Sequence, residues 1–145
     1  MNEGSVGHVY REAINIQQWV ALIATLVLGL VIVLQVLLAA GFPLGQAAWR
    51  GQYRVLPRGL RWASLATVGV LGLAAWVVLA RAGLVAPGAE VVAVQVATWV
   101  FAGFFCLNTL GNIASQSRVE RYAMTPVTVL LVICFIVVAL PTFGA

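Results

Sequence analysis

The sequence predicts an all-α membrane protein, in which a single domain of four transmembrane helices forms an up-down antiparallel bundle. Of its 145 residues, 63% are hydrophobic and only 8% are charged, whereas a soluble domain carries about 25% charged residues. The apolar residues also fall into four long runs, each able to cross a hydrocarbon core of about 30 Å. Such a chain has too few polar residues to cover a surface that faces water on all sides.

Turn-forming residues divide the chain into its spans, which we expect at about 17–40, 59–80, 91–110 and 126–141. Pro43 cannot continue the first helix, and Pro57 suits the first turn of the second. Pro87 and Gly88 form a short turn between the second and third spans. Thr125 and Pro126 read as the N-cap and first residue of the last helix.

The segment between the first two spans has two interpretations. Trp49, Tyr53 and Leu56 recur at helical spacing, which predicts a short amphipathic helix in the headgroup layer. Gly51 argues against this helix, since glycine inside a helix costs about 1 kcal/mol. An ordered re-entrant loop is the alternative.

The distribution of arginine predicts the orientation. All eight basic residues are Arg; two lie on the side of the termini and six on the other side. By the positive-inside rule, both termini lie outside and the arginine-rich loops face the cytoplasm of a bacterial inner membrane. We expect these arginines to contact membrane lipids rather than nucleic acid, because anionic lipid headgroups are the nearer phosphates.

The sequence lacks the residues that most membrane catalysts and cofactor proteins require. It contains no Asp, and its one histidine, His8, lies in the polar N-terminal segment. Cys106 and Cys134 lie in apolar runs, where cysteine acts as a small hydrophobic residue. A metal or haem site needs His, Cys or carboxylate ligands from several helices. We therefore expect no metal and no cofactor, and the pattern favours a non-enzymatic protein over an enzyme.

Polar residues gather instead on the predicted cytoplasmic face. Arginine suits bidentate contact with phosphate or carboxylate, and an Asn and Ser stripe follows the third span. Glu120 lies between two arginines in sequence, which favours an ion pair with them. The candidate ligand-binding residues are Trp49, Arg50, Tyr53, Arg54, Arg58, Arg61, Asn108, Asn112, Ser115, Arg118, Glu120 and Arg121.

Three functions are compatible with this pattern. The first is a non-enzymatic membrane protein whose cytoplasmic Arg, Asn and Ser pocket binds an anionic lipid headgroup or small anion, with transport as one setting. The second is a structural or accessory subunit, and the third is an enzyme acting on a lipid-like substrate with Glu120 as acid or base. Gln35, inside the first span, suits either an interhelical hydrogen bond or a ligand contact. A homo-oligomer is expected, with close packing through Gly59, Ala63, Thr67, Gly69 and Gly72.

Three motifs resemble a group of small, uncharacterised bacterial four-span integral membrane proteins. They are GxPxGxxxWxG at 41–51, RVLP at 54–57 and NxxSxSRxERxxMTP at 112–126. The resemblance implies the four-span layout but no activity or substrate. Arg50 departs from the WGG form of the group, which argues against a tight backbone approach at this position.

Overall fold

The computed structural model describes the backbone of residues 3–141 and the side chains of residues 16–141. The described residues form four long helices and no strand. The helices are α1 (Glu3–Ala40), α2 (Arg58–Arg81), α3 (Val92–Ile113) and α4 (Thr125–Ala139), with short 3₁₀ turns η1 (Gly45–Ala47) and η2 (Trp49–Gly51) and the π-helical turn η3 (Glu120–Met124).

Four helical segments are long and apolar enough to cross a membrane, namely Ile16–Ala40, Arg58–Arg81, Val92–Ile113 and Glu120–Ala139. The length and composition of these helices indicate an all-helical, multi-pass membrane protein. Three of the expected spans differ from these by only a few residues, whereas the fourth begins about a turn earlier than expected. The reason lies in how the chain enters α4.

The expected N-cap at Thr125 is wrong, because Thr125 itself has helical backbone angles and continues a helix that starts before it. Its N–H donates to the carbonyl of Glu120, five residues back. Pro126 explains this wider turn: proline has no N–H to donate, and in a regular α-helix its ring would clash with the carbonyl of Tyr122. The π-helical turn relieves that clash and carries the helix through the proline.

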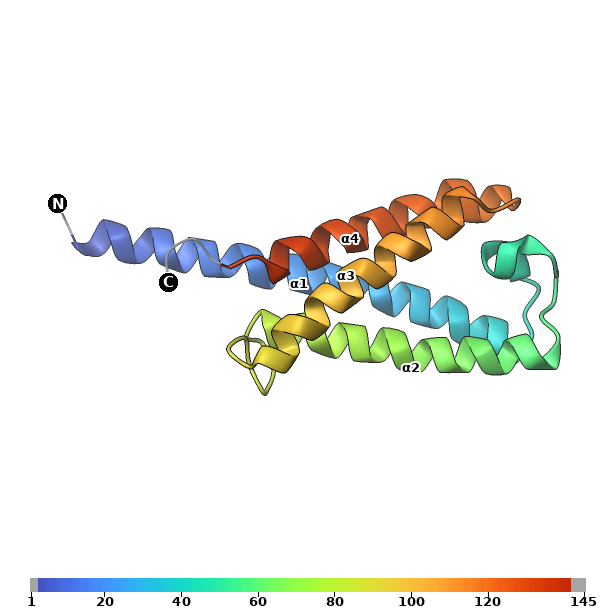
Figure 1. The fold of residues 1–145 in the computed structure, drawn as a ribbon, viewed down its shortest axis with the longest axis horizontal. Coiled ribbons are helices and arrows are strands. Elements are labelled where there is room, and N and C mark those ends of the chain that lie inside the picture. The colour runs from blue at the N-terminus through green and yellow to red at the C-terminus, as the bar shows by residue number, and fades with distance from the viewer. Residues whose placement is uncertain (1–2, 142–145) are drawn as a thin grey trace.

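Figure 1 shows two ends to the molecule. Residues 41–57 and the turn between α3 and α4 lie at one end, and residues 82–91 lie at the other. Helix α1 packs chiefly on α2 and also on α4, while α3 packs chiefly on α4. Hydrogen bonds from Gln17 to the carbonyl of Leu140 (3.0 Å) and from Arg81 to that of Ala139 (3.2 Å) join α1 and α2 to the end of α4.

Apolar side chains fill the space between the helices. Leu28, Val78, Leu131 and Phe135 are among the fully buried residues. Phe135 lies against Phe105, with ring centroids 5.2 Å apart. The outward faces are also apolar, as lipid contact requires; they expose Leu26, Leu30, Val100, Leu107 and Leu110.

The segment 41–57 is an ordered loop and not the expected amphipathic helix. Trp49, Tyr53 and Leu56 do not share a face, since Leu56 is buried and Tyr53 is exposed. Leu56 packs with Leu38 and Ala48 in a small second core. The N–H of Gly45 donates to the carbonyl of Arg54 at 3.1 Å, which closes the loop on itself.

Candidate functional site

The backbone of η2 has an unusual conformation that fixes the geometry of the site. Trp49, Arg50 and Gly51 have φ angles of 55°, 61° and 67°, a left-handed region that costs non-glycine residues about 1–2 kcal/mol each. This conformation brings the N–H of Arg50 to 3.0 Å from Oε1 of Glu120. The backbone of the first loop thus contacts a side chain of the second.

The two serines before η3 hold the other side of Glu120. The hydroxyl of Ser115 donates to Oε2 of Glu120 and accepts from the N–H of Ser117 at 3.1 Å. The hydroxyl of Ser117 in turn donates to the carbonyl of Gln46 at 2.5 Å. These contacts join the loop after α1 to the turn after α3.

The arginines on either side of Glu120 do not supply its hydrogen bonds. The carboxylate bonds to two neutral donors, the N–H of Arg50 and the hydroxyl of Ser115. The guanidinium of Arg121 donates instead to the carbonyl of Ser115 at 2.8 Å. The expected ion pair is thus replaced by bonds to uncharged groups, although Glu120 is only 6% exposed.

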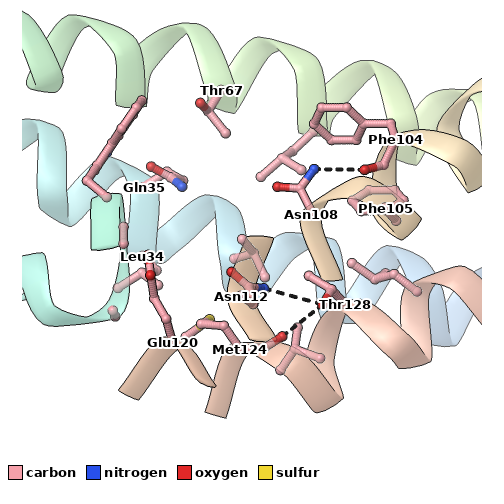
Figure 2. Close-up of a pocket in the computed structure, with 17 residues that line it drawn as sticks. Leu34, Gln35, Thr67, Phe104, Phe105, Asn108, Asn112, Glu120, Met124 and Thr128 are labelled. Atoms are coloured by element: carbon pink, nitrogen blue, oxygen red, sulfur yellow. Dashed lines mark hydrogen bonds between the residues drawn. The ribbon is translucent and has the colours of Figure 1, made fainter. Parts of the chain in front are cut away.

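A cavity of about 240 Å³ opens beside Glu120, and all four long helices contribute to its wall (Figure 2). Its deeper part is apolar, with Phe104, Phe105 and Leu131 among its residues. A second recess of about 580 Å³ adjoins it at the end of the bundle and is lined by Arg50 and Gly111 as well. The full lining of the cavity is Val31, Leu34, Gln35, Ala47, Ala48, Trp49, Thr67, Leu71, Phe104, Phe105, Asn108, Asn112, Glu120, Met124, Val127, Thr128 and Leu131.

Hydrogen bonds fix which way the asparagine amides of the wall face. Nδ2 of Asn108 donates to the carbonyl of Phe104 at 2.9 Å, and Nδ2 of Asn112 donates to the hydroxyl of Thr128 at 3.3 Å. Thr128 uses its own proton on the carbonyls of Met124 and Thr125, at 3.1 and 3.0 Å. Each amide therefore uses one of its two N–H groups on the protein, while its oxygen is left as an acceptor without a hydrogen-bond donor among the described residues.

Gln35 adds a further acceptor. Its Oε1 is buried and has no hydrogen-bond partner in the described part of the chain. A buried polar group without a partner costs about 1–3 kcal/mol. Figure 2 shows Gln35, Asn108, Asn112 and Glu120 around the same cavity, so its polar wall combines three amides with one carboxylate.

The structure separates the sequence-predicted residues into two groups. Trp49, Asn108, Asn112 and Glu120 line the cavity, Arg50 lines the adjoining recess, and Ser115 lies behind Glu120. The remaining six lie outside the cavity: Tyr53, Arg54, Arg58, Arg61, Arg118 and Arg121. Of these, Arg61 also serves the loop, since its Nε donates to the carbonyl of Leu56 at 2.9 Å.

Sequence reasoning missed several wall residues. Thr67 was assigned to a packing stripe and instead lines the cavity, as do Phe104, Phe105 and Thr128. Polar residues within the apolar spans could have identified part of this wall, because such residues face the interior of a bundle. Gln35, Thr67 and Thr128 all meet this description, whereas the aromatic residues do not.

Among the residues that the structure describes, no group of three or more His, Cys, Asp or Glu could hold a metal ion. Cys106 is exposed and Cys134 is buried, and both are free thiols. Neither a protein-family model nor a curated protein nor a solved structure matches this chain. The site itself is therefore the only basis for a functional proposal.

Proposed function

We propose that this chain is a non-enzymatic protein of the bacterial inner membrane, whose arginine-rich end binds the phosphate of an anionic lipid headgroup or a small anion. The observation that carries the proposal is a set of four exposed arginine side chains at one end of the bundle whose guanidinium groups make no hydrogen bond to the described residues. These residues, which we call the arginine surface, are Arg50, Arg54, Arg58 and Arg118.

The chemistry of this surface fits a phosphate ligand. Guanidinium groups form bidentate bonds to phosphate oxygens, and the four side chains make no hydrogen bond through their guanidinium groups to the described part of the chain. Two aromatic residues at the same end, Trp62 and Tyr122, are 72% and 73% exposed. Such residues favour the headgroup level of a bilayer, which supports placing the arginine surface among lipid phosphates.

The same reasoning gives the proposed topology. In an up-down antiparallel bundle, the arginine surface faces the cytoplasm and both termini are extracytoplasmic. Single cysteines at Gln52 and Val85, both exposed and at opposite ends of the bundle, test this in a background without Cys106 and Cys134. An impermeant thiol reagent added to whole cells should label Val85→Cys and spare Gln52→Cys. The reverse pattern would overturn the orientation.

Native mass spectrometry tests anion binding. We expect the wild type to retain phosphatidylglycerol, and Arg54→Lys and Arg58→Lys to retain less, because lysine keeps the charge but lacks the planar fork. Arg81→Lys, at the opposite end, is the control. A parallel titration with inorganic phosphate separates the two sources of the anion. Equal lipid retention in the wild type and both variants, together with no response to phosphate, would favour the accessory-subunit alternative.

We also propose that the protein forms a homo-oligomer. Gly69 and Gly72 are exposed on α2, and a Cβ added at either position would meet no atom within 4 Å. Small residues allow close approach of a second helix in a membrane. A mass measurement in mild detergent that gives only monomer at every protein concentration would contradict the proposal.

A further inference from the structure

The cavity differs in chemistry from the arginine surface. Its polar wall presents the amide oxygens of Asn108 and Asn112 and the carboxylate of Glu120, together with the side chain of Gln35. A phosphate would meet acceptors and a negative charge there, so the anion proposed above has no place in the cavity. What this wall lacks is a positive charge.

We propose that the cavity binds a primary ammonium group, supplied either by an aminophospholipid headgroup or by a free small amine. An ammonium carries three N–H donors, no acceptor and one positive charge. Its donors match the amide oxygens, and its charge balances Glu120, whose present partners are all neutral. This inference goes beyond the arginine surface and does not depend on it.

The size and walls of the cavity agree with such a ligand. A water molecule takes a share of about 30 Å³ in the liquid, so a cavity of about 240 Å³ holds a short aminoalkyl group. Beyond the oxygens, Phe104, Phe105 and Leu71 provide an apolar and aromatic wall. Such a wall suits methylene groups, and aromatic faces also attract cations.

Gln35 is the most informative member of the wall. Its amide makes no hydrogen bond to the described residues and its Oε1 is buried, so a ligand bond to this side chain would replace no contact of the fold. Glu120, by contrast, also joins the two loops through Arg50 and Ser115. The two residues therefore allow binding and folding to be tested separately.

The test measures thermal stabilisation of the full-length protein in a neutral detergent, with ethanolamine as the free probe and choline as its matched counterpart. Choline carries the same charge but no N–H donor. We expect ethanolamine to stabilise the wild type and choline to have little effect. In the second arm, native mass spectrometry compares retention of phosphatidylethanolamine with that of phosphatidylcholine. Binding in the first arm indicates a free amine, and binding in the second arm alone indicates a lipid headgroup.

Three variants assign the binding to the cavity. Glu120→Gln should weaken binding of whichever amine the wild type retains by about tenfold or more, since hydrogen bonds to charged groups are the strong ones. Gln35→Leu should weaken it without lowering the unfolding temperature, because Oε1 has no bond to lose. Gln95→Leu is the control: Gln95 bonds to the carbonyl of Ala89 at the other end and should bind as the wild type does.

Any of three results would overturn the proposal. The first is that the wild type binds neither ethanolamine nor phosphatidylethanolamine. The second is that choline, phosphatidylcholine or sodium is bound as well as the primary amines, which would show that the donors do not matter. The third is that Gln35→Leu and Glu120→Gln bind the amine as tightly as Gln95→Leu.

Discussion

The arginine surface consists of four exposed side chains on loops and helix ends, Arg50, Arg54, Arg58 and Arg118. In the cavity wall, by contrast, hydrogen bonds hold Asn108, Asn112 and Glu120 in place. The surface carries four positive charges with little fixed geometry. The cavity carries one negative charge, Glu120, with both carboxylate oxygens bonded. Under the two proposals above, the arginine surface would attract an anion by charge, whereas the cavity would select a cation by its carboxylate and amide oxygens.

The contacts that stabilise this end of the molecule lie outside the arginine surface. The contacts that join the two loops involve backbone groups, serine hydroxyls and Glu120, and not the exposed guanidinium groups. Substitutions in these joining contacts should therefore change the free energy of unfolding, while conservative substitutions on the arginine surface should change only ligand binding. The predictions below test this division.

The largest loss of stability is expected for Gly45→Ala. A Cβ at Gly45 would lie 2.0 Å from the backbone carbonyl oxygen of Tyr53, so the loop would have to move and the Gly45–Arg54 hydrogen bond would be disturbed. We expect a loss of about 3 kcal/mol or more in the free energy of unfolding, measured by denaturant titration in detergent micelles.

Gly59→Ala is the control for this change, because a Cβ at Gly59 meets nothing within 4 Å. It lies in the first turn of α2, where alanine is the better helix former by up to about 1 kcal/mol. A loss of stability in Gly59→Ala as large as that in Gly45→Ala would show that the close contact at residue 45 is not the cause.

The next largest effect is expected for Glu120→Ala. This change leaves the N–H of Arg50 and the buried hydroxyl of Ser115 without their acceptor, which costs about 1–3 kcal/mol. Glu90→Ala is the matched control, since Glu90 is exposed at the opposite end and its removal should cost no more than about 0.5 kcal/mol. Similar losses in both variants would mean that Glu120 does not join the loops.

The sequence predicted the membrane spans well because they depend on composition and length alone. Of the polar loop residues that it singled out, the structure places Glu120 in the cavity wall and Arg50 in the adjoining recess, while Arg54 and Arg118 lie outside both. The sequence did not predict the left-handed turn at 49–51, where Trp49 and Arg50 adopt angles that their residue types disfavour. Nor could it show that Glu120 bonds to a backbone N–H, because that contact depends on how two distant loops meet.

Arg50→Gly is expected to stabilise the protein. The side chain of Arg50 is exposed, and glycine adopts its φ of 61° without the strain of about 1–2 kcal/mol that other residues suffer there. The greater freedom of glycine in the unfolded chain offsets about 0.5–1 kcal/mol of this. The net gain should be about 0.5–1 kcal/mol, measured by the same denaturant titration.

Gln52→Gly serves as the control for Arg50→Gly. Gln52 is also exposed but has an ordinary φ of −68°, so glycine there relieves no strain and should destabilise by about 0.5–1 kcal/mol. The two variants should therefore differ in sign. A loss of stability in Arg50→Gly equal to that in Gln52→Gly would show that residue 50 is not strained.

The smallest change in stability is expected for Arg54→Lys. Arg54 is exposed and its guanidinium makes no hydrogen bond to the described residues, so lysine should leave the free energy of unfolding within about 0.5 kcal/mol of the wild type. Arg61→Lys in the following helix is the contrast, because Nε of Arg61 donates to the carbonyl of Leu56 at 2.9 Å and its loss should cost about 1 kcal/mol. If Arg54→Lys lowered stability as much as Arg61→Lys, the arginine surface would belong to the structural contacts of this end. If only Arg61→Lys does so, Arg54 is left for contacts outside the chain, as the proposed anion site requires.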